Sequence, residues 1–202
     1  MRCAVFTATP RGTKTALRVR ASLDASVDIF VKAGQEMPAG VRVYERLAPQ
    51  VAAAFRQYDA LVFIMATGIA VRMIAGSLKS KLEDPAVLVL DEEAQHVISL
   101  LSGHIGGANE LTRELAASLG ADPVITTATD VQKKLAVDVA AARLALRPSP
   151  KEQIKRFNSA VLDDAAIRYV IDENLARASF YKKRILPTAR LTATSPSIRP
   201  FT

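Results

Sequence analysis

One of the two histidines of the chain, His104, lies in the glycine-rich stretch SGHIGGAN at residues 102–109. Imidazole is the side chain whose ordinary pKa lies nearest neutrality, so His104 suits a general base or acid, a carboxylate ligand contact or a brace within the turn. Gly103, Gly106 and Gly107 let the backbone approach a ligand closely, and amides at the start of a following helix favour anionic groups. This stretch is therefore the first candidate site.

Two further polar stretches follow apolar, strand-like runs: ATGIA at residues 66–70 and TTATD at residues 126–130. In α/β sheets, ligands bind where the carboxyl ends of strands lead into helices, so we assign all three loops to that edge of the sheet. The two stretches supply four candidate ligand contacts: Gly68, Thr126, Thr127 and Asp130. The alternative for the last stretch is that Asp130 or Thr129 caps a helix.

Two lysines, Lys79 and Lys81, lie in GSLKSKLEDPAV at residues 76–87. They suit the binding of carboxylates, and equally the end of a helix, where lysines interact favourably with the dipole. The acidic cluster DEEAQ at residues 91–95 is interpreted as a solvated hairpin tip, with His96 at the surface beside it.

The spacing of these residues excludes several kinds of site. GHIGGAN lacks the third glycine of the dinucleotide fingerprint and the Lys-Ser/Thr of a phosphate-binding loop. Ser102 and His104 lack the third, orienting acid of a catalytic triad. No cluster of Cys, His and carboxylate residues has metal-ligand spacing, so no metal site is expected.

The sequence patterns on either side of these loops predict an α/β fold, in which a layered sheet carries helices on both faces. Strand-like runs alternate with helical spacing, which indicates a mainly parallel sheet. Residues 86–101 read as one antiparallel hairpin. Asn109 is predicted to cap the helix that follows, and Gly120 to end it. Further helices are expected at 133–146 and 151–165, and a strand at 166–174.

Composition and charge narrow the class of protein. The chain has 202 residues, of which 50% are hydrophobic, enough for a core. Residues 1–150 carry 17 basic and 15 acidic residues, a net charge of +2, and residues 151–202 carry 10 basic and 5 acidic residues, a net charge of +5.

The basic segment at residues 151–202 lacks the aromatic–basic pattern of proteins that bind single-stranded nucleic acid, so no nucleic-acid partner is expected. The apolar runs are too short to span a membrane, and the single Cys3 favours a reducing compartment, so we expect a cytoplasmic protein.

The residues also resemble a known family. GIAVR, LKSK, DPAV, VISLLSGHIGGAN and PVITTATD occur in the order and approximate spacing found in the N-terminal region of the cobalamin biosynthesis protein G family, the cobalt-precorrin-5A hydrolases. The match is nearly continuous over residues 60–130, and residues 133–186 resemble the more variable middle domain of that family.

The resemblance implies a step in the anaerobic branch of vitamin B12 synthesis. These enzymes open the δ-lactone on the ring A acetate of cobalt-precorrin-5A and release the C20 carbon with its methyl group as acetaldehyde, giving cobalt-precorrin-5B. The cobalt belongs to the substrate, and no separate cofactor is implied.

On this basis we hypothesise that His104 is the base, Asn109 and the Gly106 or Gly107 amide are oxyanion donors, and Asp130 orients His104 or the water. The expected substrate contacts are Gly68, Arg72, Lys79, Lys81, Ser102, Gly103, Gly106, Gly107, Thr126 and Thr127.

The expected organisation is an N-terminal α/β domain at residues 1–132, a small α/β middle domain at 133–186 and an irregular tail at 187–202. Full-length members of the family also carry a C-terminal domain with a Gly-Cys-Arg-type motif, which nothing in this sequence matches. We therefore expect the chain to work with a separately encoded C-terminal domain or other pathway enzymes, to be a truncated form, or to be inactive alone. The alternative function is a non-catalytic module that binds the corrinoid intermediate or a partner.

Overall fold

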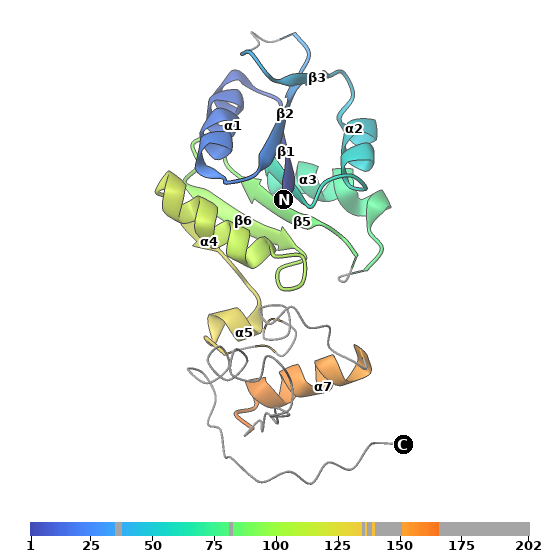
Figure 1. The fold of residues 1–202 in the computed structure, drawn as a ribbon, viewed down its shortest axis with the longest axis vertical. Helices are drawn as coiled ribbons and strands as arrows, with labels where there is room; N and C mark the ends of the chain where they lie inside the picture. Colours follow the sequence, from blue (N-terminus) through green and yellow to red (C-terminus); the bar gives the residue numbers. More distant parts are fainter. Residues whose placement is uncertain (35–37, 81–82, 135, 137–138, 140–150, 166–202) are drawn as a thin grey trace, which may run out of the picture. The chain divides into compact units, whose positions relative to one another are not determined.

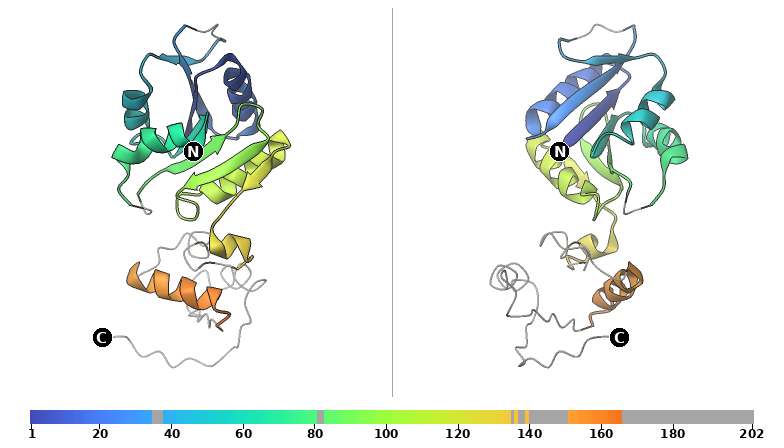
Figure 2. Two further views of the ribbon diagram at one scale, coloured as in Figure 1. Left: turned by 180° about the vertical axis from the view of Figure 1, so that it is seen from behind. Right: turned by 45° about the vertical axis from the view of Figure 1, so that its right-hand side comes forward.

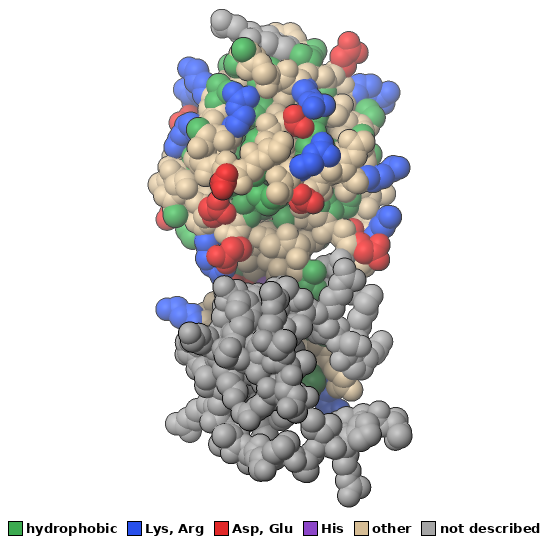
Figure 3. Space-filling view, viewed as in Figure 1, with side chains coloured by type: hydrophobic (Ala, Val, Ile, Leu, Met, Phe, Trp, Pro, Cys, Tyr) green, Lys and Arg blue, Asp and Glu red, His purple; other side chains and the backbone are tan. Residues whose placement is uncertain are grey.

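The computed structural model describes all residues except 35–37, 81–82, 135, 137–138, 140–150 and 166–202. It divides into two compact units, Met1–Thr126 and Thr127–Thr202 (Figure 1). The candidate loops before Thr127 all belong to the first unit. On the face drawn in Figure 3, basic and acidic side chains are interspersed over that unit.

The first unit is built on a seven-stranded sheet in the order β3-β2-β1-β4-β5-β6-β7. The strands are β1 (Arg2–Thr7), β2 (Ser26–Lys32), β3 (Arg42–Tyr44), β4 (Ala60–Ile64), β5 (Ala86–Leu90), β6 (His96–Leu101) and β7 (Asp122–Val124). Every neighbouring pair is parallel except β5 and β6, which are antiparallel. The predicted α/β class, with one antiparallel hairpin in a mainly parallel sheet, is confirmed.

Helices cover both faces of this sheet (Figures 1 and 2). They are α1 (Pro10–Ser22), α2 (Leu47–Ala54), α3 (Thr67–Ile74) and α4 (Ala108–Leu119), with a short 3-10 turn η1 (Ala75–Ser77) after α3. Apolar residues of α1 and α4 pack in one core cluster, and those of α2 and α3 pack in a second cluster on the other face. This gives the three layers that the sequence predicts.

The central strands are buried along their whole length because both of their faces are covered. All residues of β4 and β5 are buried, which explains their continuous apolar sequences. Phe6 of β1 stacks on Phe30 of β2 and on Phe63 of β4, with ring centroids 4.8 and 5.4 Å apart. These rings join three neighbouring strands on the α2–α3 face.

Two helix starts differ from the predictions. Helix α3 begins at Thr67, so most of the stretch predicted as a loop at 66–70 is helical. Helix α4 begins at Ala108 after Gly107, whose φ of +83° suits glycine, so the prediction that Asn109 caps this helix is wrong. The helix ends at Leu119, and Gly120 follows it with a φ of +72°, as predicted.

The second unit contains α5 (Ala128–Val131) and α7 (Lys151–Leu162). Helix α7 confirms the helix predicted at 151–165. The residue that precedes α5 is Thr127, so the predicted capping by Asp130 or Thr129 is wrong. Most of the helix predicted at 133–146, the strand at 166–174 and the tail at 187–202 lie outside the described residues.

We predict that Phe6→Ala lowers the free energy of unfolding of the first unit by about 3–5 kcal/mol, because it opens a cavity between stacked rings. Cys3 is the natural reporter, since burial raises the pKa of its thiol to about 12 and only unfolding exposes it. Thiol labelling across a urea series measures the change. Val71→Ala, at a side chain 45% exposed on α3, is the control and should cost less than about 1 kcal/mol. Equal effects of the two variants would contradict the prediction.

Candidate functional site

The direction of β6 separates the three predicted loops. Leu101 at the end of β6 pairs with Val87 at the beginning of β5, and β7 runs parallel to β6. The residues that follow β6 and β7 therefore lie at the end of the sheet where β5 begins, whereas those that follow β4 lie at the opposite end. The expectation that all three loops share one edge is wrong, because the rule on which it rests applies to parallel strands.

The glycine loop at residues 102–107 folds back on the start of α4. The Ala108 amide donates to the Ser102 carbonyl at 3.2 Å, the Asn109 amide to the Gly103 carbonyl at 2.9 Å, and the Gly107 amide to the His104 carbonyl at 3.1 Å. These three amides are engaged within the loop in this conformation. The hypothesis that Gly107 donates to an oxyanion therefore requires the loop to rearrange.

Asn109 lies beneath the loop. It is 3% exposed, and its Oδ1 accepts a hydrogen bond from the Ser99 hydroxyl at 2.6 Å. A Cβ at position 103 would lie 2.6 Å from this Oδ1, so glycine lets the backbone rest on the carboxamide. The structure thus places Asn109 as a brace between β6, the loop and α4.

Ser102 carries backbone strain and a buried hydroxyl. Its φ is +57°, a conformation that residues other than glycine rarely adopt. Its Oγ is one of two buried side-chain polar atoms, among the described residues, without a hydrogen-bond partner. A Cβ at Gly106 would lie 2.4 Å from the Ser102 Cβ. The loop is therefore tightly packed at the point where β6 ends.

Lys79 lies at the same end of the sheet as the glycine loop, because its segment leads into β5. The Asp84 carboxylate accepts the backbone amide of Lys79 at 3.0 and 3.3 Å, which holds the segment in a turn. The Lys79 side chain is exposed. Thr126, which follows β7, shares this end. Lys81 lies outside the described residues.

The other predicted contacts are not gathered here. Gly68 and Arg72 belong to α3, which follows β4 at the opposite end, and the Arg72 guanidinium donates to the Gly68 carbonyl at 3.0 Å. Thr127 and Asp130 belong to the second unit. His104 itself is half-buried in the glycine loop. The roles predicted for these residues stay predictions.

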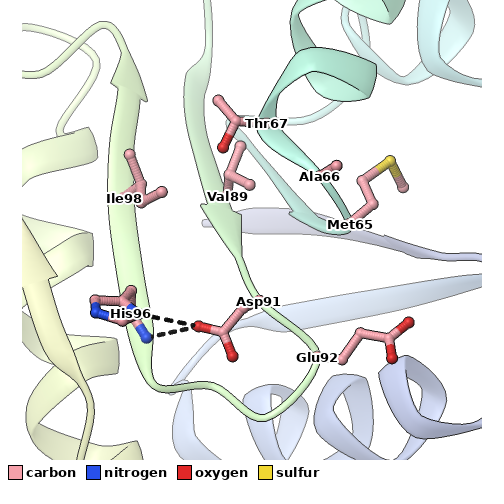
Figure 4. A pocket seen from close by; sticks show the side chains of 8 residues that line it. All are labelled: Met65, Ala66, Thr67, Val89, Asp91, Glu92, His96 and Ile98. Atoms are coloured by element: carbon pink, nitrogen blue, oxygen red, sulfur yellow. Dashed lines mark hydrogen bonds and ion pairs between the residues drawn. The ribbon is translucent and has the colours of Figure 1, made fainter.

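At the opposite end, a cavity of about 390 Å³ lies beside the carboxyl ends of β4 and β5 (Figure 4). Met65, Val89 and Ile98 provide its apolar side chains, and Ala66 and Thr67 at the start of α3 form a wall. The sheet order reverses between β1 and β4, and the carboxyl edge near such a point is where open α/β sheets bind ligands.

The polar rim of this cavity comes from the hairpin tip: Asp91, Glu92 and His96. The Asp91 carboxylate accepts the backbone amides of Glu93 at 3.0 Å, Gln95 at 3.1 Å and His96 at 2.8 Å. Burial alone would raise the pKa of Asp91, but these hydrogen bonds outweigh it and hold the pKa below its ordinary value. The His96 Nδ1 lies 3.5 Å from the Asp91 Oδ2 (Figure 4).

Glu92 holds the tip against α1. Its carboxylate accepts the Thr9 hydroxyl, and its carbonyl accepts the Thr15 hydroxyl at 2.6 Å. The acidic residues at the turn gave no signal of this cavity, because such residues are usually only solvated. A signal that could have found it is the succession of a buried strand, a short turn and a helix at residues 60–74. This succession places the carboxyl edge of the sheet, where ligands bind in α/β proteins, next to the hairpin at 86–101.

The described residues limit the chemistry further. They contain no group of three or more His, Cys, Asp or Glu side chains that could hold a metal ion. No described helix has the length and apolar character needed to cross a bilayer. Cys3 is buried in β1 with its pKa raised to about 12, which makes it an unreactive thiol.

The fold and its loops define a doubly wound α/β domain with a glycine loop at one end and a cavity at the other. Residues 49–130 match the family model described as cobalamin synthesis G N-terminal, and the chain belongs to the cobalamin biosynthesis protein G family. It is 50% identical to the cobalt-precorrin-5A hydrolase of Salmonella typhimurium over 147 residues, an alignment that covers 72% of this chain. It is 49% identical to the cobalt-precorrin-5A hydrolase of Priestia megaterium over 116 residues, which is 57% of this chain.

A solved structure supports the fold. A chain described as a cobalamin biosynthesis protein G homologue from Sulfolobus solfataricus aligns with 86% of this chain at 29% identity and a TM-score of 0.52. The present chain spans 41% and 31% of the two curated relatives and 50% of the solved chain.

We predict that Gly106→Ala destabilises the first unit by about 1–3 kcal/mol, because the new Cβ overlaps Ser102. The matched control is Gly76→Ala, where no atom lies within 4 Å of the added Cβ. Urea unfolding followed by Cys3 labelling compares them. A cost no larger than that of the control would contradict the packing described for the loop.

We also predict that Asp91→Asn lowers the free energy of unfolding at pH 7 by about 1 kcal/mol, because one charged acceptor of three backbone amides is lost. The folded-state pKa of Asp91 is depressed, so its contribution is complete above the unfolded-state pKa and disappears as the pH falls through the folded-state pKa. The difference from wild type should therefore shrink below about pH 4. Glu114→Gln on the exposed face of α4 is the control, and a difference that persists unchanged in acid would refute the assignment.

Proposed function

We propose that this chain forms the N-terminal part of a cobalt-precorrin-5A hydrolase of anaerobic cobalamin biosynthesis. The reaction opens the ring A δ-lactone of cobalt-precorrin-5A and releases acetaldehyde, giving cobalt-precorrin-5B. The observation that carries the proposal is the 50% identity over 147 residues to the Salmonella enzyme. The chain spans less than half of that relative, so the reaction is proposed for the assembled protein, with a C-terminal part as partner.

The end of the sheet that holds the glycine loop suits the substrate's periphery. The substrate is a macrocycle with many acetate and propionate groups, which need cationic and amide donors. Lys79 is exposed at this end of the sheet, and Ser102 and Thr126 follow the neighbouring strands β6 and β7. The Ser102 hydroxyl is buried in this conformation, so its contact with a ligand requires the loop to rearrange. These residues are proposed to bind substrate carboxylates, with Lys81, Gly103, Gly106 and Gly107.

Opening a lactone needs an activated water and a donor to the oxyanion that forms at the carbonyl. His104 is one candidate for the base, and its place in the glycine loop equally suits a hydrogen bond to a carboxylate. The two roles differ in their kinetic consequences. Loss of a base lowers kcat, whereas loss of a contact made equally to the substrate and the transition state raises KM.

Cobalt is carried by the substrate, and the residues above act on the organic ring without a separate cofactor. We propose the cytoplasm as the location, in keeping with a reducing compartment for the single Cys3. A non-catalytic corrinoid-binding module is not favoured, since the named relatives are hydrolases.

The test is anaerobic incubation with cobalt-precorrin-5A and an assay for acetaldehyde. The chain is tested alone and with the C-terminal part of the Salmonella relative. We predict acetaldehyde release, and a several-fold higher KM for Lys79→Ala than for wild type, because a charged contact to the substrate is lost. Lys14→Ala, exposed on α1, is the matched control and should leave KM unchanged. Bound substrate without acetaldehyde in either preparation would contradict the hydrolase and leave a binding module.

A further inference from the structure

The cavity at the hairpin end differs in charge from the glycine-loop end. Among the described residues that line it there is no Lys or Arg, whereas Asp91 and Glu92 lie on its rim. A carboxylate brought here would meet like charges, which disfavours it. The apolar side chains of Met65, Val89 and Ile98 together with a few polar groups suit an uncharged group that accepts and donates hydrogen bonds.

His96 carries the one imidazole among the described residues that line this cavity, and an imidazole nitrogen with a lone pair can accept a proton. Three backbone amides hold the Asp91 carboxylate in place, and its Oδ2 lies 3.5 Å from the His96 Nδ1. A fixed carboxylate at this position favours the imidazole tautomer with its proton on Nδ1. The Nε2 atom then keeps a lone pair and can accept a proton, as in sites where an acid orients a histidine base.

One face of β6 connects the cavity with the glycine loop. His96, Ile98 and Leu100 alternate along the strand and so share the face that lies opposite α4. Helix α4 lies in front of β6 in Figure 1 and behind it in the left view of Figure 2. Ile98 and Leu100 are half-buried apolar side chains. From His96 to Leu101 the strand extends about 16 Å, at about 3.3 Å per residue.

We propose that the cavity beside Met65 receives an uncharged ester or lactone carbonyl, with His96 as the general base and Asp91 as its positioning residue. This inference rests on the proposed function: the lactone edge of the macrocycle lies in the cavity, its ring lies along Ile98 and Leu100, and its carboxylates reach the glycine loop. His104 then binds a carboxylate and does not activate water.

The step balances with water as the only co-reactant. His96 Nε2 takes a proton from water while the water oxygen bonds to the carbonyl carbon, giving a tetrahedral oxyanion. Collapse of that intermediate breaks the bond to the ring oxygen, which leaves as an alkoxide and takes the proton back from His96. The products are a carboxylic acid and an alcohol. The Thr67 hydroxyl and backbone amide, at the start of α3, lie at the cavity wall as donors for the oxyanion.

The first test needs no turnover. A His104→Gln background leaves His96 as the only histidine, so nitrogen-15 imidazole spectra report it alone. The neutral ring should carry its proton on Nδ1, and Asp91→Asn should convert it to a mixture of tautomers. Neutral His96 with its proton mainly on Nε2 in the Asp91-containing protein overturns the positioning role, whatever Asp91→Asn does to the hairpin.

The same sample tests the ligand class with 2-piperidone, an uncharged analogue of a δ-lactone that does not hydrolyse under these conditions. It should shift the Met65 methyl and His96 Nε2 signals, whereas acetate at equal concentration should leave the Met65 methyl unshifted. Equal shifts by acetate, or none by 2-piperidone, overturn the proposal.

Kinetics then separate this inference from the proposed function. In the preparation that releases acetaldehyde, His96→Gln should lower kcat by about 10²–10⁴-fold with little change in KM, the usual range for a general base. His104→Gln should raise KM and keep kcat within a few-fold of wild type. The opposite pattern assigns the base to His104 and overturns the inference while leaving the hydrolase intact. Absence of acetaldehyde from wild type contradicts the proposed function, and the imidazole spectra still decide the site.

Discussion

The single antiparallel step between β5 and β6 is the constraint that arranges the rest of the first unit. Strands β1 to β5 are mutually parallel, so their carboxyl ends point one way, whereas β6 and its parallel neighbour β7 run the other way. Because β6 returns beside β5, the glycine loop is placed at the far end, next to the segment that leads into β5. One reversal therefore gives the sheet two chemically different ends.

The tip of the hairpin that makes this reversal is held by hydrogen bonds. Asp91 accepts three backbone amides of the turn, and Glu92 ties the turn to Thr9 and Thr15 of the α1 region. These contacts fix the acidic rim of the cavity over the start of α1. At the other end the loop depends on close packing, with glycine at positions 103 and 106 against Asn109 and Ser102. The hairpin end is thus held by hydrogen bonds to carboxylates, whereas at the glycine-loop end small residues let the backbone pack closely.

Much of this fold is predictable from local pattern, because apolar periodicity reports which residues are buried. The strand at 60–64, the hairpin at 86–101 and the end of α4 at Gly120 follow from it. The antiparallel hairpin predicted at 86–101 already turns β6 back beside β5, so the shared edge predicted for the three loops is inconsistent with it and is wrong. Only the parallel pairing of β7 with β6 depends on contacts that local pattern does not report. Asn109 resembled a cap by residue type, but the glycine at 107 takes that place and leaves the carboxamide buried. The proximity of His96 and Asp91 to Met65 and Thr67 could not be predicted from local pattern, because the cavity they line is formed by segments distant in the sequence.

The arrangement proposed above places one tetrapyrrole ligand against both ends of the sheet, along the half-buried face of β6 that carries Ile98 and Leu100. Paramagnetic broadening by cobalt(II) uroporphyrin, a ring with acetate and propionate groups, tests it most directly in NMR spectra of the labelled chain. We expect broadening of the Met65 methyl, the Leu100 methyls and the Gly107 amide, with Val43 of β3 unaffected. Broadening confined to one end, or strongest at Val43, would contradict it.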